Sequence, residues 1–205
     1  MTRFPAHIIV AVVLVLQFAA GTASAGHGLM NAFSDPPPLP EAGVTPAQMS
    51  YFLDEWHESI AIATTSSGFG KLHTLLEIAD EKLAESLLLV SQHDQSNASV
   101  AVSNYASVIA ELIDEIETIA HTLEPEQIAS VMQRLLEQQY FAAFDYLEYP
   151  RERRTPLLEI QKPAGTAYEL LKDRLSRREA EAFFFKEEEI RWQWEMAIQG
   201  DHQGL

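Results

Sequence analysis

Two consecutive amphipathic segments, residues 71–91 and 97–122, constrain the fold of this chain more than any other feature. In the second segment, apolar side chains recur every three or four residues, which places them on one face of an α-helix. This face comprises Ala101, Tyr105, Val108, Ile109, Leu112, Ile116, Ile119 and Leu123. Because only the polar stretch 91–96 separates the two segments, the sequence predicts an antiparallel helix hairpin.

The first segment of this hairpin and the segment at 125–149 also carry a continuous apolar face. In the first, the predicted core face is Leu72, Leu75, Leu76, Ala79, Leu83, Leu87 and Val90. In the other, which begins at Pro125, it is Ile128, Val131, Met132, Leu135, Ala142 and Tyr146. No stretch shows the sustained alternation that is typical of β-strands. We therefore predict an all-α fold, a helical bundle of five or six helices around the antiparallel hairpin.

The helix nearest the N-terminus is expected at 46–64. Thr45 and Gln48 have the spacing of a capping box, and Pro46 suits the first helical position. Its predicted core stripe is Met49, Phe52, Leu53, Trp56, Ile60 and Ala63. After a Pro- and Arg-rich connector at 150–163, a short helix is expected at 164–175. A last helix begins after a second capping box, Ser176 with Glu179, and ends near residue 198.

Residues 1–25 have the pattern of a secretory signal peptide. The apolar run 8–16 is short and precedes Ala23-Ser24-Ala25, an A-x-A cleavage signal. We expect an exported protein, periplasmic or extracellular, with no stable membrane span after cleavage; the alternative is that the segment remains as an anchor. Residues 26–44 form a Pro-rich extended leader, and 45–200 a single helical domain.

Charge and composition exclude several classes of function. The chain has a net charge of −16 and no cysteine, so we exclude thiolate catalysis and Cys-ligated metal. Between residues 26 and 149, 19 acidic residues face only Lys71, Lys82 and Arg134, which argues against nucleic acid as a partner. The sequence has no nucleophile elbow, phosphate loop or His-Glu-x-x-His motif. We therefore predict a protein that is not an enzyme and has no catalytic residues.

The strongest local candidate for a metal site is Asp54, His57 and Glu58. Their i, i+3, i+4 spacing places them on one side of a helix, where a carboxylate and imidazole set can bind a divalent cation. The simpler interpretation is a solvated flank of the helix, because the predicted core stripe lies beside it. We expect no cofactor and at most weak binding of divalent cations.

An unusual concentration of aromatic residues marks the last helix. Phe183, Phe184, Trp192 and Trp194 would cover more than one helical face. One face fills the core, and the excess suggests a surface for a protein partner or for self-association, since Trp and Phe are enriched at interface centres. A wholly buried last helix is the alternative.

Two stretches resemble a known family. Residues 39–56 (LPEAGVTPAQMSYFLDEW) and 76–89 (LEIADEKLAESLLL) resemble an exported bacterial and archaeal helical family, a domain of unknown function, and the resemblance covers about residues 39–122. The residues that match its Leu-Pro-x-x-Gly-x-Thr-Pro and Tyr-x-Leu-Asp pattern are Leu39, Pro40, Gly43, Thr45, Pro46, Tyr51, Leu53 and Asp54. The resemblance implies helices without a known activity.

A weaker resemblance concerns Val44-Thr45-Pro46-Ala47-Gln48, which is similar to the Leu-Thr-x-x-Gln repeat of Spy/CpxP-type periplasmic proteins. We thus expect an exported, non-enzymatic helical interaction or scaffold protein with an acidic face. The alternative is a periplasmic stress or metal-responsive protein with chaperone-like binding.

Overall fold

The computed structural model describes residues 39–148 and 155–202, and the only regular secondary structure in these ranges is helical. The long helices are α2 (Tyr51–Thr64), α3 (Phe69–Ser91), α4 (Gln95–Ile119), α5 (Pro125–Glu148), α6 (Thr155–Lys172) and α8 (Phe184–His202), with a short α7 (Arg177–Ala180) before α8. The predicted all-α class is confirmed. The proposed signal peptide, residues 26–38 of the leader and the Arg cluster at 151–154 lie outside the described residues.

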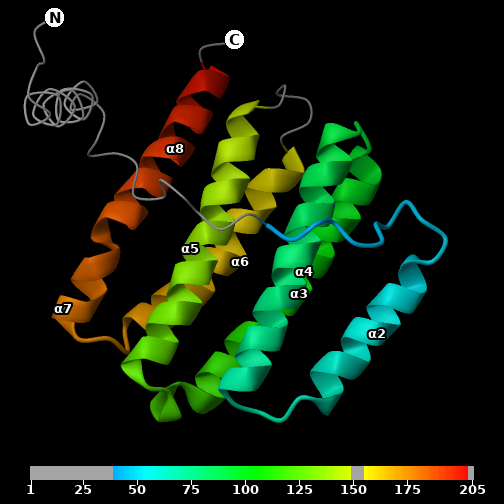
Figure 1. The fold of residues 1–205 in the computed structure, drawn as a ribbon. Helices are drawn as coiled ribbons and strands as arrows, with labels where there is room; N and C mark the ends of the chain where they lie inside the picture. The colour runs from blue at the N-terminus through cyan, green and yellow to red at the C-terminus, as the bar shows by residue number, and fades with distance from the viewer. Residues whose placement is uncertain (1–38, 149–154, 203–205) are drawn as a thin grey trace, which may run out of the picture. The chain divides into compact units, whose positions relative to one another are not determined.

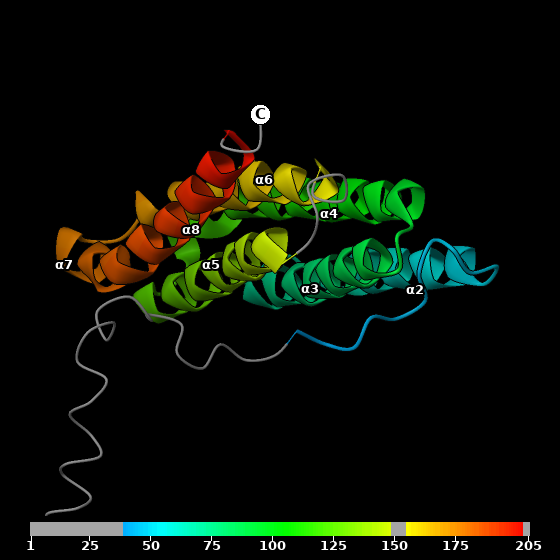
Figure 2. The same ribbon diagram turned by 90° about the horizontal axis from the view of Figure 1, so that it is seen from above.

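The core lies between two layers of helices (Figures 1 and 2). The antiparallel pair α3 and α4 has the most extensive packing, and α5 and α6 extend it, so that α3 lies beside α5 in one layer and α4 beside α6 in the other. The predicted faces of α3, α4 and α5 are largely buried, as the amphipathic patterns required. The most enclosed large apolar side chains are Leu72, Leu75, Leu83, Leu89, Ile109, Leu112, Met132, Leu135 and Leu157.

Two helices lie at the edges of these layers. α8 packs on α5, and α2 packs only sparingly on α3. The segment 39–50 crosses the outer side of α3 before it enters α2 (Figures 1 and 2). Within the described ranges, the helices are all too short or too polar to cross a membrane. On α2 and on α8, the side that points away from the bundle is therefore available to solvent.

The beginning of α2 differs from the prediction. The backbone N–H of Gln48 donates to the carbonyl of Thr45 at 2.9 Å, and that of Tyr51 donates to Gln48 at 3.1 Å. Residues 45–50 therefore form successive turns, and the helix begins at Tyr51, after Ser50, instead of at Pro46. Thr45 is buried, so tertiary contacts rather than a capping box fix this segment.

The connector predicted at 150–163 is helical from Thr155 onward. α6 runs through Pro163, a residue expected to interrupt it. Pro163 removes the backbone donor for the carbonyl of Glu159, whose side chain lies on the exposed side of the helix, where water can replace the bond. Buried Ile160, Ala164 and Ala167 hold the rest of the helix against α4 and α5, so packing outweighs the local preference.

Candidate functional site

A lysine lies in the core of the bundle, surrounded by carboxylates. The side chain of Lys82 on α3 is 1 % exposed. Its Nζ lies 2.7 Å from Glu58 Oε1, 3.0 Å from Glu85 Oε1 and 3.7 Å from Asp54 Oδ2. We call Lys82 with Asp54, Glu58, Glu81 and Glu85 the Lys82 cluster; Glu81 belongs to it because its charge acts on both Glu58 and Glu85.

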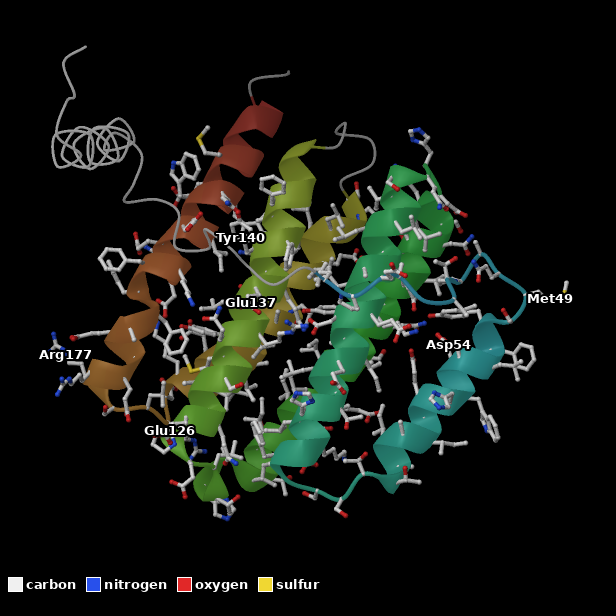
Figure 3. The ribbon with its side chains drawn as sticks, in the orientation of Figure 1. Met49, Asp54, Glu126, Glu137, Tyr140 and Arg177 are labelled. Carbon is white, nitrogen blue, oxygen red and sulfur yellow. The ribbon has the colours of Figure 1, made fainter. Side chains whose placement is uncertain are left out.

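The cluster joins α2 to α3. Asp54 and Glu58 are one turn apart on α2, and Figure 3 shows Asp54 pointing toward α3. The ring of Tyr51, one turn earlier, has its centroid 4.9 Å from Lys82 Nζ, a cation–π contact. Asn104 of α4 donates to the hydroxyl of Tyr51 at 2.7 Å and to Glu55 at 2.8 Å. Polar contacts thus supply much of the attachment of α2 to the bundle.

Burial and charge shift the proton affinities of the Lys82 cluster. Burial raises the pKa of Glu85 to about 7, an effect that the contact with Lys82 only partly offsets. Burial also raises the pKa of Glu58 and of Glu81, and the neighbouring Asp54 adds to both effects. For Lys82, burial alone would lower the pKa, but Glu58 and Glu85 outweigh it and hold the pKa above its ordinary value. The lysine therefore stays charged, and Glu85 exchanges its proton near neutrality.

Three carboxylates of the cluster also form a set that could hold a cation. One oxygen from each of Asp54, Glu81 and Glu85 lies within 4.8 Å of the other two. Among the described residues, this is the one group of at least three potential ligands that is close enough to hold a metal ion. It combines one residue of α2 with two residues one turn apart on α3.

The predicted metal residues Asp54, His57 and Glu58 are divided between two roles. Asp54 and Glu58 face α3 and contact Lys82, so they do not form the solvated flank that the simpler interpretation assigned to them. His57 is exposed and lies outside the three-carboxylate set. Glu81 and Glu85, which the sequence analysis did not connect with α2, complete the set.

The predicted core stripe of the first helix faces solvent, so that prediction was wrong. Phe52 is 64 % exposed and Trp56 is 67 % exposed, and Figure 3 shows Met49 pointing away from the bundle. We call this row of side chains the α2 face; it consists of Met49, Phe52, Leu53, Trp56 and Ile60, all of them exposed. The helix is turned so that its carboxylates reach Lys82, and this orientation leaves the apolar row outside.

The four aromatic residues predicted as an interaction surface are also divided. Phe183 and Trp194 are buried, and Phe183 packs edge-on against the ring of Tyr168. Phe184 and Trp192 remain exposed on α8. The interaction surface stays a prediction, to which the two buried residues offer no exposed side chain. The accessible part of the surface is Phe184 and Trp192, with Phe185 beside them.

A second buried polar group lies between α3, α4 and α5. Asp80 accepts hydrogen bonds from Gln138 at 2.7 Å and from Arg134 at 2.5 Å, and Tyr105 donates to Gln138 at 2.8 Å. Burial raises the pKa of Asp80, against the opposing effect of these donors. A cavity of about 370 Å³ opens beside it, lined by His73, Leu76, Glu77, Asp80, Ser130, Gln133, Arg134 and Glu137. Because the donors already satisfy Asp80, this group is structural.

Sequence reasoning missed Lys82 as the centre of the site. One signal pointed to it: Lys82 lies beside Leu83 and three residues after Ala79, at the edge of the predicted core face of α3. A helix packed against α2, α4 and α5 buries more than one face, so a charge at that edge becomes enclosed. The sequence alone did not show that α2 would cover this edge.

Comparison with known proteins gives one family. No curated protein and no solved structure matches the chain. The matching family model is the Domain of unknown function (DUF5667), over residues 43–139, a range that begins at Gly43 in the leader and ends within α5. This range includes all residues of the Lys82 cluster and all residues of the α2 face. Residues 43–139 are thus similar to this family, whose function is unknown.

Proposed function

We propose that the chain is an exported, non-enzymatic interaction protein whose α2 face binds a protein partner. The observation that carries this proposal is the outward orientation of Phe52, Trp56 and their apolar neighbours on an edge helix. Export rests on the signal-peptide pattern of residues 1–25.

The size of the α2 face supports a binding role. Five large apolar side chains at these exposures present on the order of 600 Å² of apolar surface. The largest apolar patch on an ordinary monomer is about 300–600 Å² and is often functional. A typical stable interface buries about 800 Å² on each partner. The α2 face with its polar border therefore has the dimensions of one side of a specific interface.

The charge of the chain indicates the chemistry of the partner. The chain carries a net charge of −16, and helix α2, on which most of the α2 face lies, contains no Lys or Arg. Two copies would repel each other, whereas a basic protein would be attracted. We therefore favour a different protein that presents an apolar surface bordered by Lys and Arg side chains over a second copy of this chain.

The burial and pairing of Lys82 and Glu85, the side chains of the cluster with the largest pKa shifts, support a role without catalysis. Lys82 and Glu85 are 1 % and 0 % exposed, and each is the other's partner at 3.0 Å. A general acid or base must come within hydrogen-bond reach of a substrate. Enclosed and paired in this way, these groups are suited to holding α2 in place.

A second candidate function is chaperone-like binding of unfolded clients. The observation that favours it is a second exposed aromatic surface on α8, formed by Phe184, Phe185 and Trp192. Separate apolar surfaces suit weak contacts with many clients. Suppression of aggregation of a model client by the purified chain, lost in Trp192→Ser but retained in Trp56→Ser, would favour this alternative.

Site-specific photocrosslinking tests the proposal. A photoreactive phenylalanine analogue replaces Trp56 in the chain expressed in its native host, and the same analogue replaces exposed His121 as the control. We expect a crosslink to a discrete protein from position 56 only. The purified partner should then bind the native chain, with an affinity that falls at least about tenfold in Phe52→Ser and declines with added salt.

Three outcomes would overturn the proposal. The first is equal crosslinking from positions 56 and 121, which would indicate contacts by collision. The second is a crosslink only between two copies of the chain, which would assign the α2 face to self-association. The third is unchanged affinity for the purified partner in Phe52→Ser.

A further inference from the structure

The set formed by Asp54, Glu81 and Glu85 combines features of a cation site. Glu81 and Glu85 are one turn apart on α3, and Asp54 approaches them from α2, so that one oxygen of each lies within 4.8 Å of the others. Clusters of acidic side chains are common on protein surfaces without any ion. The burial and bonding of Glu85 distinguish this one.

Glu85 has one carboxylate oxygen without a partner. Its side chain is fully buried at 0 % exposure, and Oε1 contacts Lys82 at 3.0 Å. The second oxygen, Oε2, is buried and has no hydrogen-bond partner in the described part of the chain. A buried polar atom that lacks a partner is costly, and native proteins generally supply one, whether protein, water or ion.

The charge of the Lys82 cluster is also unbalanced. Lys82 contributes one positive charge, against four carboxylates from Asp54, Glu58, Glu81 and Glu85. The ammonium lies closest to Glu58 and Glu85, whereas Glu81 forms no ion pair with it among the described contacts. The negative charge that remains is therefore concentrated on the side of the cluster where Asp54, Glu81 and Glu85 meet.

We propose that Asp54, Glu81 and Glu85 bind a calcium ion, which joins α2 to α3 beside Lys82. Hard divalent cations prefer carboxylate oxygens, and Ca²⁺ takes 6–8 of them at about 2.3–2.6 Å. The three oxygens lie within 4.8 Å of one another and so are close enough to bind one ion, and a set drawn from two helices suits the flexible coordination of Ca²⁺ better than the strict octahedron that Mg²⁺ demands.

The surroundings of the three carboxylates allow an ion to enter and water molecules to complete its coordination shell. Asp54 and Glu81 are only partly buried, so solvent reaches these two members of the set, whereas Glu85 is fully buried. Gly43 in the segment 39–50 borders Glu81: a Cβ on this glycine would lie 2.0 Å from Glu81 Oε1. The missing side chain at Gly43 thus leaves the space in which the Glu81 carboxylate lies.

The calcium site is independent of the partner proposed for the α2 face. It lies on the opposite, inward side of α2, and its binding is measurable on the purified chain without any partner. Its effect would be to stabilise the attachment of α2 and so to fix the outward orientation of Trp56.

Calorimetric titration of the purified chain, stripped with a chelator, with CaCl₂ tests the proposal. The main variant is Glu81→Gln, because Glu81 is a proposed ligand that forms no ion pair with Lys82. The matched control is Glu77→Gln, one turn earlier on the same helix, where the side chain is exposed. We expect saturable binding with one site, a thermal midpoint that rises with Ca²⁺, and an affinity at least about tenfold lower in Glu81→Gln than in Glu77→Gln.

Thermal unfolding of each variant without Ca²⁺ provides a check that it is folded, so that lost binding is not confused with lost structure. Absence of saturable binding by the native chain at millimolar Ca²⁺ would overturn the proposal. Equal weakening in Glu77→Gln and Glu81→Gln would also overturn it, because it would reduce the effect to general screening of an acidic surface. Equal affinity for Mg²⁺ at the same ionic strength would refute the assignment of calcium.

Discussion

Replacement of Lys82 by Met is the sharpest test of the buried cluster. Methionine keeps most of the length and apolar volume of the lysine stem but removes the ammonium group. Glu58 and Glu85 then lose the cation that lies 2.7 and 3.0 Å from them, and Tyr51 loses its cation–π contact. Lys82→Met should therefore destabilise the domain through uncompensated carboxylates rather than through a cavity.

The expected magnitude follows from the burial of the pair. Removing one partner of a buried ion pair costs about 3–5 kcal/mol, because the remaining charge is enclosed without compensation. Lys71→Met on the same helix is the matched control, since Lys71 is 25 % exposed and contacts a single carboxylate, Glu115, at 3.2 Å. Lys71 is partly exposed, and Glu115 keeps the hydrogen bonds from Ser67 and Gly68 without it, so the loss of Lys71 should cost about 1 kcal/mol or less.

The loss of unfolding free energy in Lys82→Met should increase as the pH rises. An acid whose pKa is higher in the folded than in the unfolded state binds an extra proton on folding, so stability decreases as pH rises between the two values. For Glu85 this window extends from 4.5 to about 7. Without the ammonium, the charged carboxylates are still less favourable, so Lys82→Met should lose more stability at pH 8 than at pH 5.

Urea unfolding followed by circular dichroism and tryptophan fluorescence, with a chelator present, measures both effects. A cost below about 1 kcal/mol at pH 8, or equal costs for Lys82→Met and Lys71→Met, would refute the assignment of Lys82 as a buried charge centre. A cost that is the same at pH 5 and pH 8 would show that the carboxylates around Lys82 are not its cause.

Three further variants test neighbouring parts of the molecule. Glu85→Gln should stabilise the domain at pH 8 by up to about 3 kcal/mol, because the rise of the Glu85 pKa from 4.5 to about 7 on folding measures the cost of burying the charged carboxylate. In the same urea assay, this gain should disappear near pH 4.5. Trp56→Ser should change the unfolding free energy by less than about 0.5 kcal/mol, whereas Leu72→Ala should cost about 2–5 kcal/mol, because Leu72 is fully buried; a large cost at Trp56 would contradict the outward orientation of α2. Tyr105→Phe should cost about 1–2 kcal/mol in thermal unfolding, because Gln138 loses a buried donor at 2.8 Å; a neutral result would show that another donor replaces it.

The helical spacing of the apolar residues and the polar residues of the intervening turns were sufficient to predict the central helices. The faces of α3 and α4 contain large aliphatic residues at regular helical spacing, and short polar turns leave no other arrangement than a hairpin. The capping box of Ser176 and Glu179 is also present: the Ser176 N–H donates to Glu179 Oε2 at 2.9 Å. These features depend on residues close in sequence, so sequence patterns capture them.

Features that depend on distant contacts were not predictable in the same way. Pro163 lies inside α6 because Ile160 and Ala164 pack against other helices, and nothing near residue 163 indicates that packing. Similarly, Asp54 and Glu58 contact Lys82, more than twenty residues away in the chain. Their spacing on α2 correctly placed them on one side of a helix but carried no information about what that side would meet.

The orientation of α2 shows why an amphipathic pattern does not by itself assign the inner face. The pattern of Phe52 and Trp56 defines an apolar side, and the neighbouring helix decides which side is covered. At about 25 cal/mol per Å², burying roughly 600 Å² on the α2 face would contribute on the order of 10–15 kcal/mol before the costs of ordering, as an upper estimate. In the isolated chain this contribution is unused, because the carboxylates on the other side of α2 hold Lys82. A partner that covers the α2 face would realise part of it without breaking those ion pairs, and the same helix can therefore be attached through its charged side and bind through its apolar side.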